Sequence, residues 1–244
     1  MTSRLADRGI RVVLLDIEGT TTPIAFVHET LFPYARQRAR VFLDAHGDDL
    51  EVRRARDLLV AEHAIDLDRD APPFASPKTI DALVDYVEWL MDRDRKSPGL
   101  KLLQGEIWEQ GYRSGELRGL VFGDVAPAIR RWHDAGLRVA IYSSGSELAQ
   151  RRLFESTADG DLTPLLSGFF DTRVGAKVES ASYARIASAL GVTSSTMLFI
   201  SDVTRELAAA REAGLQVVLS LRPGNPAQSE RTLYDCVSSF EELR

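Results

Sequence analysis

The chain has 244 residues, of which 44% are hydrophobic and 27% are charged, a composition that is typical of a globular protein. Its 30 basic and 36 acidic residues give a net charge of −6, which argues against general binding to nucleic acid or to anionic membranes. A single cysteine, Cys236, excludes an internal disulfide and fits a reducing compartment, and without a signal-peptide core or a long apolar run we expect a cytoplasmic protein with no membrane span.

The first predicted element is a strand at Val12–Leu15 that is followed closely by two acids. Four consecutive apolar residues indicate a strand covered on both faces. Asp16 follows directly, and Glu18 precedes Gly19, which makes a tight turn easy. Buried carboxylates are costly without a cation, and open α/β sheets bind ligands beyond the carboxyl ends of their strands. We therefore expect Asp16 and the backbone carbonyl of Glu18 to face one cation, although a lone Asp here would also cap a turn.

Residues 26–115 carry helical apolar spacing in place of the strand pattern. Ser76-Pro77 and Ser97-Pro98 each combine an N-cap residue with proline at the first helical position, and each predicts the start of a helix. The basic residues at positions 36, 38 and 40 are interpreted as a solvated helix face. A helical insertion next to the predicted site is placed to act as a lid.

From Asp124 onward the predicted elements alternate between helix and strand. Helices are expected at 124–135, 147–155, 180–190 and 203–213, and strands at 137–142, 168–171, 196–201 and 216–221. This alternation predicts an α/β fold with a doubly wound parallel sheet, covered by helices on both faces. Because the first strand must join that sheet, we expect a core domain of residues 1–25 and 116–244 and an inserted helical cap domain of residues 26–115.

A second group of polar residues follows the strand predicted at 137–142. The hydroxyls and backbone amides of Ser143, Ser144 and Gly145 precede a helix and make a natural phosphate cradle. The alternative is an ordinary helix N-cap, a role that we assign to Ser146.

Two charged residues follow later strands. Lys177, between a strand and a helix, can neutralise a phosphate and a carboxylate, although the default for a lysine is the surface. Asp202 ends the apolar run Met197–Ile200, and the alternative is an N-cap of the next helix. Two buried strands that each end in Asp at one crevice favour a hard-oxygen cation site over two unrelated caps.

The stretch Asp16–Ile24, Asp-Ile-Glu-Gly-Thr-Thr-Thr-Pro-Ile, resembles the first motif of the haloacid-dehalogenase-like phosphatases. In its longer form it is similar to that of the enolase-phosphatases (acireductone synthases) of methionine salvage, in which Glu replaces the more usual second Asp. The later groups, around Ser143, Lys177 and Asp202, match the second, third and fourth motifs in order. Ser201 replaces the usual Gly of the fourth motif, and Glu206 would be its second acid, with metal ligation, support of a ligand and a helix salt bridge all open.

The resemblance implies a Rossmann-like core, a helical cap, one Mg²⁺ per site and a small phosphorylated substrate. That substrate is 2,3-diketo-5-methylthiopentyl-1-phosphate, which is enolised and then dephosphorylated to the acireductone. The implied site comprises the nucleophile Asp16, the general acid and base Glu18, the phosphate-binding residues Ser143, Ser144 and Lys177, and the Mg²⁺ ligands Asp16, Glu18 (through its carbonyl) and Asp202.

Several points stay open at this stage. The base that removes the proton from carbon is Glu18 or another residue. The alternatives to this function are a Mg²⁺-dependent phosphatase of another small phosphoester and a non-catalytic phospho-ligand binding protein on the same scaffold. We expect a monomer that binds neither nucleic acid nor membrane.

Overall fold

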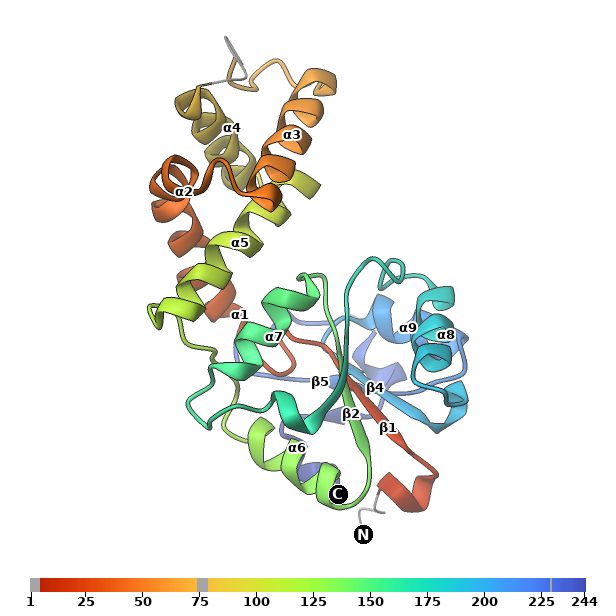
Figure 1. Cartoon of the computed structure of the whole chain (residues 1–244). Helices are drawn as coiled ribbons and strands as arrows, with labels where there is room; N and C mark the ends of the chain where they lie inside the picture. The colour runs from red at the N-terminus through yellow and green to blue at the C-terminus, as the bar shows by residue number, and fades with distance from the viewer. Residues whose placement is uncertain (1–4, 74–78, 229) are drawn as a thin grey trace. The chain divides into compact units, whose positions relative to one another are not determined.

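The computed structural model describes residues 5–73, 79–228 and 230–244, and the chain divides into two compact units (Figure 1). The core unit combines Met1–Val27 with Arg118–Arg244, and the helical unit comprises His28–Leu117. Both junctions fall two residues later than those expected from the sequence. Each unit is described by itself below.

The core unit is built on a parallel sheet, which in the described residues has six strands in the order β3-β2-β1-β4-β5-β6. Strand β1 lies between β2 and β4, and the chain winds outward from it in both directions, so the predicted doubly wound sheet is confirmed. The strands are β1 (Val12–Leu15), β2 (Arg138–Tyr142), β3 (Leu166–Phe170), β4 (Met197–Ser201), β5 (Gln216–Ser220) and β6 (Cys236–Val237).

Helices cover both faces of this sheet. Successive side chains of a strand point to opposite faces, and every residue of β1 is buried, as coverage of both faces requires. Val12 and Leu14 join the apolar cluster that packs beneath α8 and α9, while α6 and α7 lie on the other side (Figure 1). The helices of the core unit are α1 (Ile24–Phe26), α6 (Val125–Asp134), α7 (Glu147–Glu155), α8 (Ser180–Ala189) and α9 (Thr204–Glu212).

The strand predictions were least accurate at the edges of the sheet. Strand β3 begins at Leu166, two residues before the predicted start, and β6 was not predicted at all. Because β6 has only two residues and one of them, Cys236, is exposed, it carries no apolar pattern that could identify it.

The helical unit has an apolar core of its own, which includes Ala35, Leu59, Val87 and Leu103. Ser97 caps α5 as predicted, since its side chain accepts a hydrogen bond from the Leu100 N–H. The predicted start at Ser76-Pro77 lies outside the described residues. The elements of this unit are a π-helical turn (Val27–Leu31, whose first residue belongs to the core unit), α2 (Phe32–His46), α3 (Leu50–Ile65), α4 (Ile80–Asp92) and α5 (Pro98–Ser114).

The basic face of α2 is solvated, as predicted. Its three arginines are at least 39% exposed in their side chains, and each pairs with an acid. The pairs are Arg36–Asp92, Arg38–Glu116 and Arg40–Asp81. Along the part of the chain that the structure describes, no helix combines the length and the apolarity needed to cross a membrane.

Candidate active site

Asp16 is held rigidly at the carboxyl end of β1. Its N–H donates to the Ile200 carbonyl of β4, and its own carbonyl accepts from the Thr21 hydroxyl at 3.0 Å. The side chain is turned inward and is only 4% exposed, with Oδ1 accepting from the Ile17 N–H at 2.7 Å. A buried carboxylate at this position requires compensating charge.

Lys177 supplies that charge. Its Nζ lies 2.6 Å from Asp16 Oδ1 and 2.6 Å from Glu206 Oε2. Because Lys177 is 8% exposed, the alternative of a surface lysine was wrong. Burial alone would lower the pKa of the ammonium, but the carboxylates of Asp16 and Glu206 outweigh burial and hold the pKa of Lys177 above its usual value. Lys177 is therefore a buried cation between two acids.

Backbone anchors bring Lys177 to this point from the segment that follows β3. The Tyr183 hydroxyl of α8 donates to the Lys177 carbonyl at 2.6 Å, and the Tyr142 hydroxyl donates to the Gly175 carbonyl at 2.9 Å. Both tyrosines are fully buried, Tyr142 in β2 and Tyr183 in α8, and both belong to the same apolar cluster. The segment that precedes α8 is thus tied to the apolar core through the backbone of Gly175 and Lys177.

Ser201 links the two carboxylates, a role that sequence reasoning did not assign to it. Its Oγ lies 2.9 Å from Asp16 Oδ2 and 3.0 Å from Glu206 Oε2, and it accepts from the Val203 N–H. A hydroxyl carries one proton, so it donates to one of these acids at a time. The signal in the sequence was the departure from the family pattern, because the usual glycine at this position has no hydroxyl to donate.

Asp202 lies across the Gly19 turn from the end of β1. It is 6% exposed, and it is not the N-cap of α9, which is Val203 without a side-chain cap. Gly19 has φ +69°, and a Cβ added to it would stand 2.4 Å from Asp202 Oδ2, so only glycine fits here. Burial and then the negative charge of Asp16 raise the pKa of Asp202 to about 7.

The donor chemistry of this crevice fits a small hard cation. Asp16 and Asp202 are both buried carboxylates, and burial together with the charge of Asp16 raises the pKa of Asp202. A divalent ion bound between them would relieve this repulsion. Within the described residues, no three His, Cys, Asp or Glu side chains are grouped to hold a metal ion, so such an ion needs a backbone oxygen as well. Mg²⁺ is typically held by one or two carboxylates together with other oxygens and water.

Glu206 does not form a salt bridge along its own helix. It contacts Lys177 and Ser201 instead, and burial together with the charge of Asp16 raises its pKa. Because Lys177 contacts both Glu206 and Asp16, Glu206 supports the cation that neutralises Asp16.

The serines after β2 lie at the same edge of the sheet. Strand β2 pairs in parallel with β1, with Ile141 opposite Leu15, so the Ser143–Gly145 loop follows β2 where Asp16 follows β1. Ser146 caps α7 as predicted, because its side chain accepts from the Ala149 N–H at 3.2 Å. Gln150 donates to the Gly145 carbonyl at 2.8 Å and so holds the loop. Ser143 is half-buried and Ser144 is exposed, and neither is used as the cap of α7.

Glu18 stands in the turn that leaves β1. Its backbone bridges to Thr22, while the Gly19 N–H donates to the Thr22 carbonyl at 2.9 Å. The Glu18 side chain is exposed, in contrast to that of Asp16. The turn therefore presents one acid inward and the next one outward.

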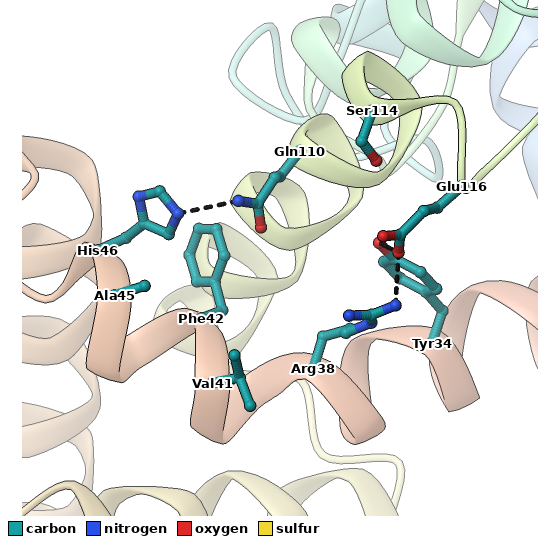
Figure 2. A pocket seen from close by; sticks show the side chains of 9 residues that line it. All are labelled: Tyr34, Arg38, Val41, Phe42, Ala45, His46, Gln110, Ser114 and Glu116. Carbon is teal, nitrogen blue, oxygen red and sulfur yellow. Dashed lines mark hydrogen bonds and ion pairs between the residues drawn. The ribbon is translucent and has the colours of Figure 1, made fainter.

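The helical unit has a pocket of its own, of about 170 Å³, between α2 and the end of α5 (Figure 2). Arg38 and Glu116 form an ion pair at 2.6 Å on one side of this pocket, and Gln110 lies 2.9 Å from His46 on the other (Figure 2). These charges are 46% to 49% exposed, so the pocket lacks the desolvated carboxylates that distinguish the core crevice.

Comparisons with known proteins agree with this combination of fold and site. A model of the haloacid dehalogenase-like hydrolases matches residues 10–214, and the chain belongs to that family. It is 53% identical over 234 residues to Enolase-phosphatase E1 of Synechococcus elongatus, covering 96% of this chain and 98% of the relative. It is 43% identical over 246 residues to Enolase-phosphatase E1 of Salmo salar, covering 95% and 93%. The resemblance to the enolase-phosphatases is thereby confirmed.

Solved structures give the same result. The UTR4 protein of Saccharomyces cerevisiae is similar with a TM-score of 0.76 and 34% identity, covering 96% of this chain and 100% of that one. CbbY from Rhodobacter sphaeroides in complex with phosphate has a TM-score of 0.57 at 20% identity, covering 95% of each chain, and supports the fold alone.

Proposed function

We propose that this chain is an enolase-phosphatase that converts 2,3-diketo-5-methylthiopentyl-1-phosphate into acireductone and phosphate. The names of its relatives and the motif at Asp16–Ile24 support this reaction. The observation that carries the proposal is the buried contact of 2.6 Å between Asp16 and Lys177, with Asp202 on the other side of the Gly19 turn. Carboxylates and a buried ammonium are the groups that a phosphoryl transfer to Asp requires.

In the phosphatase step, Asp16 acts as the nucleophile. A carboxylate oxygen of Asp16 forms a bond to phosphorus while the bond from phosphorus to the enol oxygen breaks. Glu18 gives a proton to the departing oxygen, and afterwards takes one from the water that hydrolyses the aspartyl-phosphate. Lys177 neutralises both the nucleophile and the phosphate, and Ser143, Ser144 and nearby amides hold the phosphate oxygens.

Mg²⁺ is the cofactor of this proposal. Asp16, the carbonyl of Glu18 and Asp202 would hold one ion, which supplies positive charge that screens the approach of two anions. Glu206 serves a different purpose, because its contacts with Lys177 and Ser201 keep the ammonium and the hydroxyl aimed at Asp16. Glu206 is thus a positioning residue here and not a ligand.

In the enolase step, a proton leaves the carbon that bears the phosphoryloxy group. Lys177 or the bound Mg²⁺ would stabilise the negative charge that develops on the enolate oxygen. Glu18 is the general base that the turn itself offers beside the nucleophile, and a different residue would be needed if Glu18 served only the phosphatase step.

The function is tested by incubating the purified chain with the diketone phosphate, with and without Mg²⁺. Ultraviolet absorbance follows the enol, and phosphorus NMR follows the phosphate. We expect both signals with Mg²⁺, loss of phosphate release in EDTA, and recovery when Mg²⁺ is restored. Ca²⁺ should support the reaction poorly because it prefers a larger and looser shell. Release of phosphate from other small phosphoesters but not from the diketone would reject the substrate, and full activity in EDTA would reject the metal site.

We also propose that the helical unit acts as a cap, that the enzyme is a monomer and that it works in the cytoplasm. The helical unit is inserted directly after the segment that carries Asp16 and Glu18, which supports the first point. Saturating substrate should protect the two junctions from proteolysis, and unchanged cleavage would contradict a cap. Sedimentation as a species larger than 27.0 kDa would contradict a monomer.

A further inference from the structure

The turn after Asp16 is held from outside through three consecutive carbonyls. The Gly19 carbonyl accepts from Asn225 Nδ2 at 2.8 Å and from the Ser220 hydroxyl at 3.3 Å. The Thr20 carbonyl accepts from Arg222 Nε at 3.1 Å, and the Thr21 carbonyl accepts from a backbone N–H just before α6. Three of these four donors come from the segment Ser220–Asn225, which begins at the last residue of β5.

Arg222 in this segment is accounted for by structure. Besides Thr20, its guanidinium donates to Asp124 at 2.8 Å and to the Ser238 carbonyl at 3.0 Å. It also lies 4.6 Å and 4.5 Å from the ring centroids of Phe122 and Phe240. These contacts fasten the turn to the end of the chain, while Arg222 Nη2 is buried without a hydrogen-bond partner among the described residues.

In Asn225 only one end of the side-chain amide is occupied, and the unoccupied end is an acceptor. Its NH₂ group donates to the Gly19 carbonyl and, at 3.5 Å, to the Ser220 carbonyl. Its Oδ1 is buried and has no hydrogen-bond partner among the described residues. The reverse orientation of the amide would set the oxygen against two carbonyl acceptors, so the contacts determine which end faces the turn.

The unpartnered oxygen faces the Asp202 side of the turn. The point where a Cβ of Gly19 would stand lies 2.4 Å from Asp202 Oδ2 and 3.1 Å from Asn225 Oδ1. Both acceptors therefore lie beside Gly19, on the side where its Cβ would stand. A buried acceptor that stays unpaired is costly, so a donor is expected at this place.

We propose that Asn225 is a positioning residue of the metal site, whose NH₂ group holds the Gly19 turn while its Oδ1 accepts a hydrogen bond from the hydration shell of the divalent ion held by Asp202. This inference rests on the proposed function. Mg²⁺ keeps several of its waters in proteins, and these waters are strong donors because the ion polarises them. Removing a hydrogen-bond partner of the groups bound to a metal typically weakens metal affinity by about 10- to 100-fold.

The sequence offers an unusually direct test, because Asn225 is the only asparagine in the chain. Protein labelled with ¹⁵N in the asparagine side chain will show one amide NH₂ pair in a correlation spectrum. We expect this pair to shift as Mg²⁺ is added, with the half-saturation that calorimetry gives for Mg²⁺ on the same sample. In Asp202→Ala, which removes a ligand, the Mg²⁺-dependent shift should disappear.

Calorimetry in the absence of substrate measures how strongly each variant binds Mg²⁺, and so gives the size of the effect. Asn225→Ala is expected to weaken Mg²⁺ binding by about 10- to 100-fold. Gln228→Ala is the matched control, because Gln228 carries the same amide group shortly after Asn225 in the chain and contacts Thr204 and Pro226 instead of the turn. Its Mg²⁺ affinity should equal that of the unaltered protein.

Three results would overturn the inference. If calorimetry shows Mg²⁺ binding but the asparagine signal does not move, the role of Asn225 is rejected and the proposed function stands. If Asn225→Ala binds Mg²⁺ as tightly as the unaltered protein, the residue has a structural role only. If the unaltered protein binds no Mg²⁺, the proposed metal site and this inference fall together.

Discussion

Both units of this protein contain closely spaced opposite charges, yet the charges differ in what surrounds them. In the helical unit, the side chains of Arg36, Asp92, Arg38 and Glu116 are 39% to 57% exposed. In the core unit, the side chains of Asp16, Lys177 and Glu206 are only 5% to 13% exposed. The distances between charged atoms are similar in the two places, so distance does not distinguish a site from a solvated surface.

Burial makes the difference. An exposed pair contributes about 0–1 kcal/mol, because water screens it and two long side chains lose freedom. In a buried cluster, taking each ion out of water costs several kcal/mol, which only close partners can offset. Removing one partner then leaves the other charge buried and uncompensated. A protein retains such a cluster where chemistry needs it, and the raised pKa of Asp202 marks this cluster.

The largest effect is expected where the comparison is most extreme, at Asp16. Asp16→Asn keeps the shape of the side chain but removes the nucleophile, so phosphate release should fall by about 10,000-fold or more. Enolisation needs no attack on phosphorus, so the phosphorylated enol should accumulate, as followed by ultraviolet absorbance and phosphorus NMR. Normal phosphate release with a normal melting curve would remove Asp16 from the mechanism. Absence of the enol and of solvent deuterium at that carbon would point to Asp16 as the carbon base.

Lys177→Met tests whether the buried cation matters as much as the acids around it. Losing a charge that stabilises the transferring phosphoryl group should lower kcat by about 100- to 1000-fold and weaken inhibition by inorganic phosphate. The control is Lys96→Met in the helical unit, where the side chain is exposed and both quantities should stay unchanged. Equal effects of the two substitutions would contradict the importance of burial.

A second buried ion pair, Arg222–Asp124, has no role in the proposed reaction and therefore tests what burial alone does to stability. The atoms lie 2.8 Å apart and the side chains are 4% and 12% exposed. Asp124→Ala should cost about 3 kcal/mol of unfolding free energy, because Arg222 is left without its counter-charge. Chemical denaturation measures this loss, and a loss below 1 kcal/mol would show that burial alone does not make a pair important.

The same pair predicts a pH dependence. Burial raises the pKa of Asp124, but hydrogen bonds from the Phe240 N–H and from Arg222 outweigh burial and hold it below the usual value of 3.8. A lowered pKa means that the unfolded state binds the proton more readily, so the stabilisation is present above pH 3.8 and is lost as pH falls through the folded-state value. The difference in stability between Asp124→Ala and the unaltered protein should therefore shrink below that pH, and a constant difference would reject the linkage.

The smallest effect is expected in the helical unit. Arg38→Ala removes the exposed pair with Glu116 (Figure 2) and should change the unfolding free energy by less than about 1 kcal/mol. Activity on the diketone phosphate should be unaltered. A loss of more than 2 kcal/mol would show that exposed pairs of this chain behave like buried ones.

The sequence by itself determined the elements and the acids that follow them. Apolar runs such as Val12–Leu15 and Met197–Ile200 are buried on both faces, and the pattern that predicts this burial can be read from consecutive residues. The alternation of helix and strand after Asp124 was sufficient to predict the parallel sheet, because few topologies accommodate such an alternation. Asp16 and Asp202 could be selected for the same reason, since each follows a strand that no water reaches.

Only the tertiary structure decided how these residues meet. Ser201 and Asp16 are 185 positions apart, and Asn225 and Gly19 are 206 apart, so no local pattern connects the members of either pair. The sequence singled out Lys177 by its position between a strand and a helix and by the family resemblance, but only packing brings its ammonium between Asp16 and Glu206. Which charges lose their water is set by the elements that pack around them, and it is this desolvation, absent from the sequence, that turns an ordinary acid and an ordinary lysine into a reactive pair.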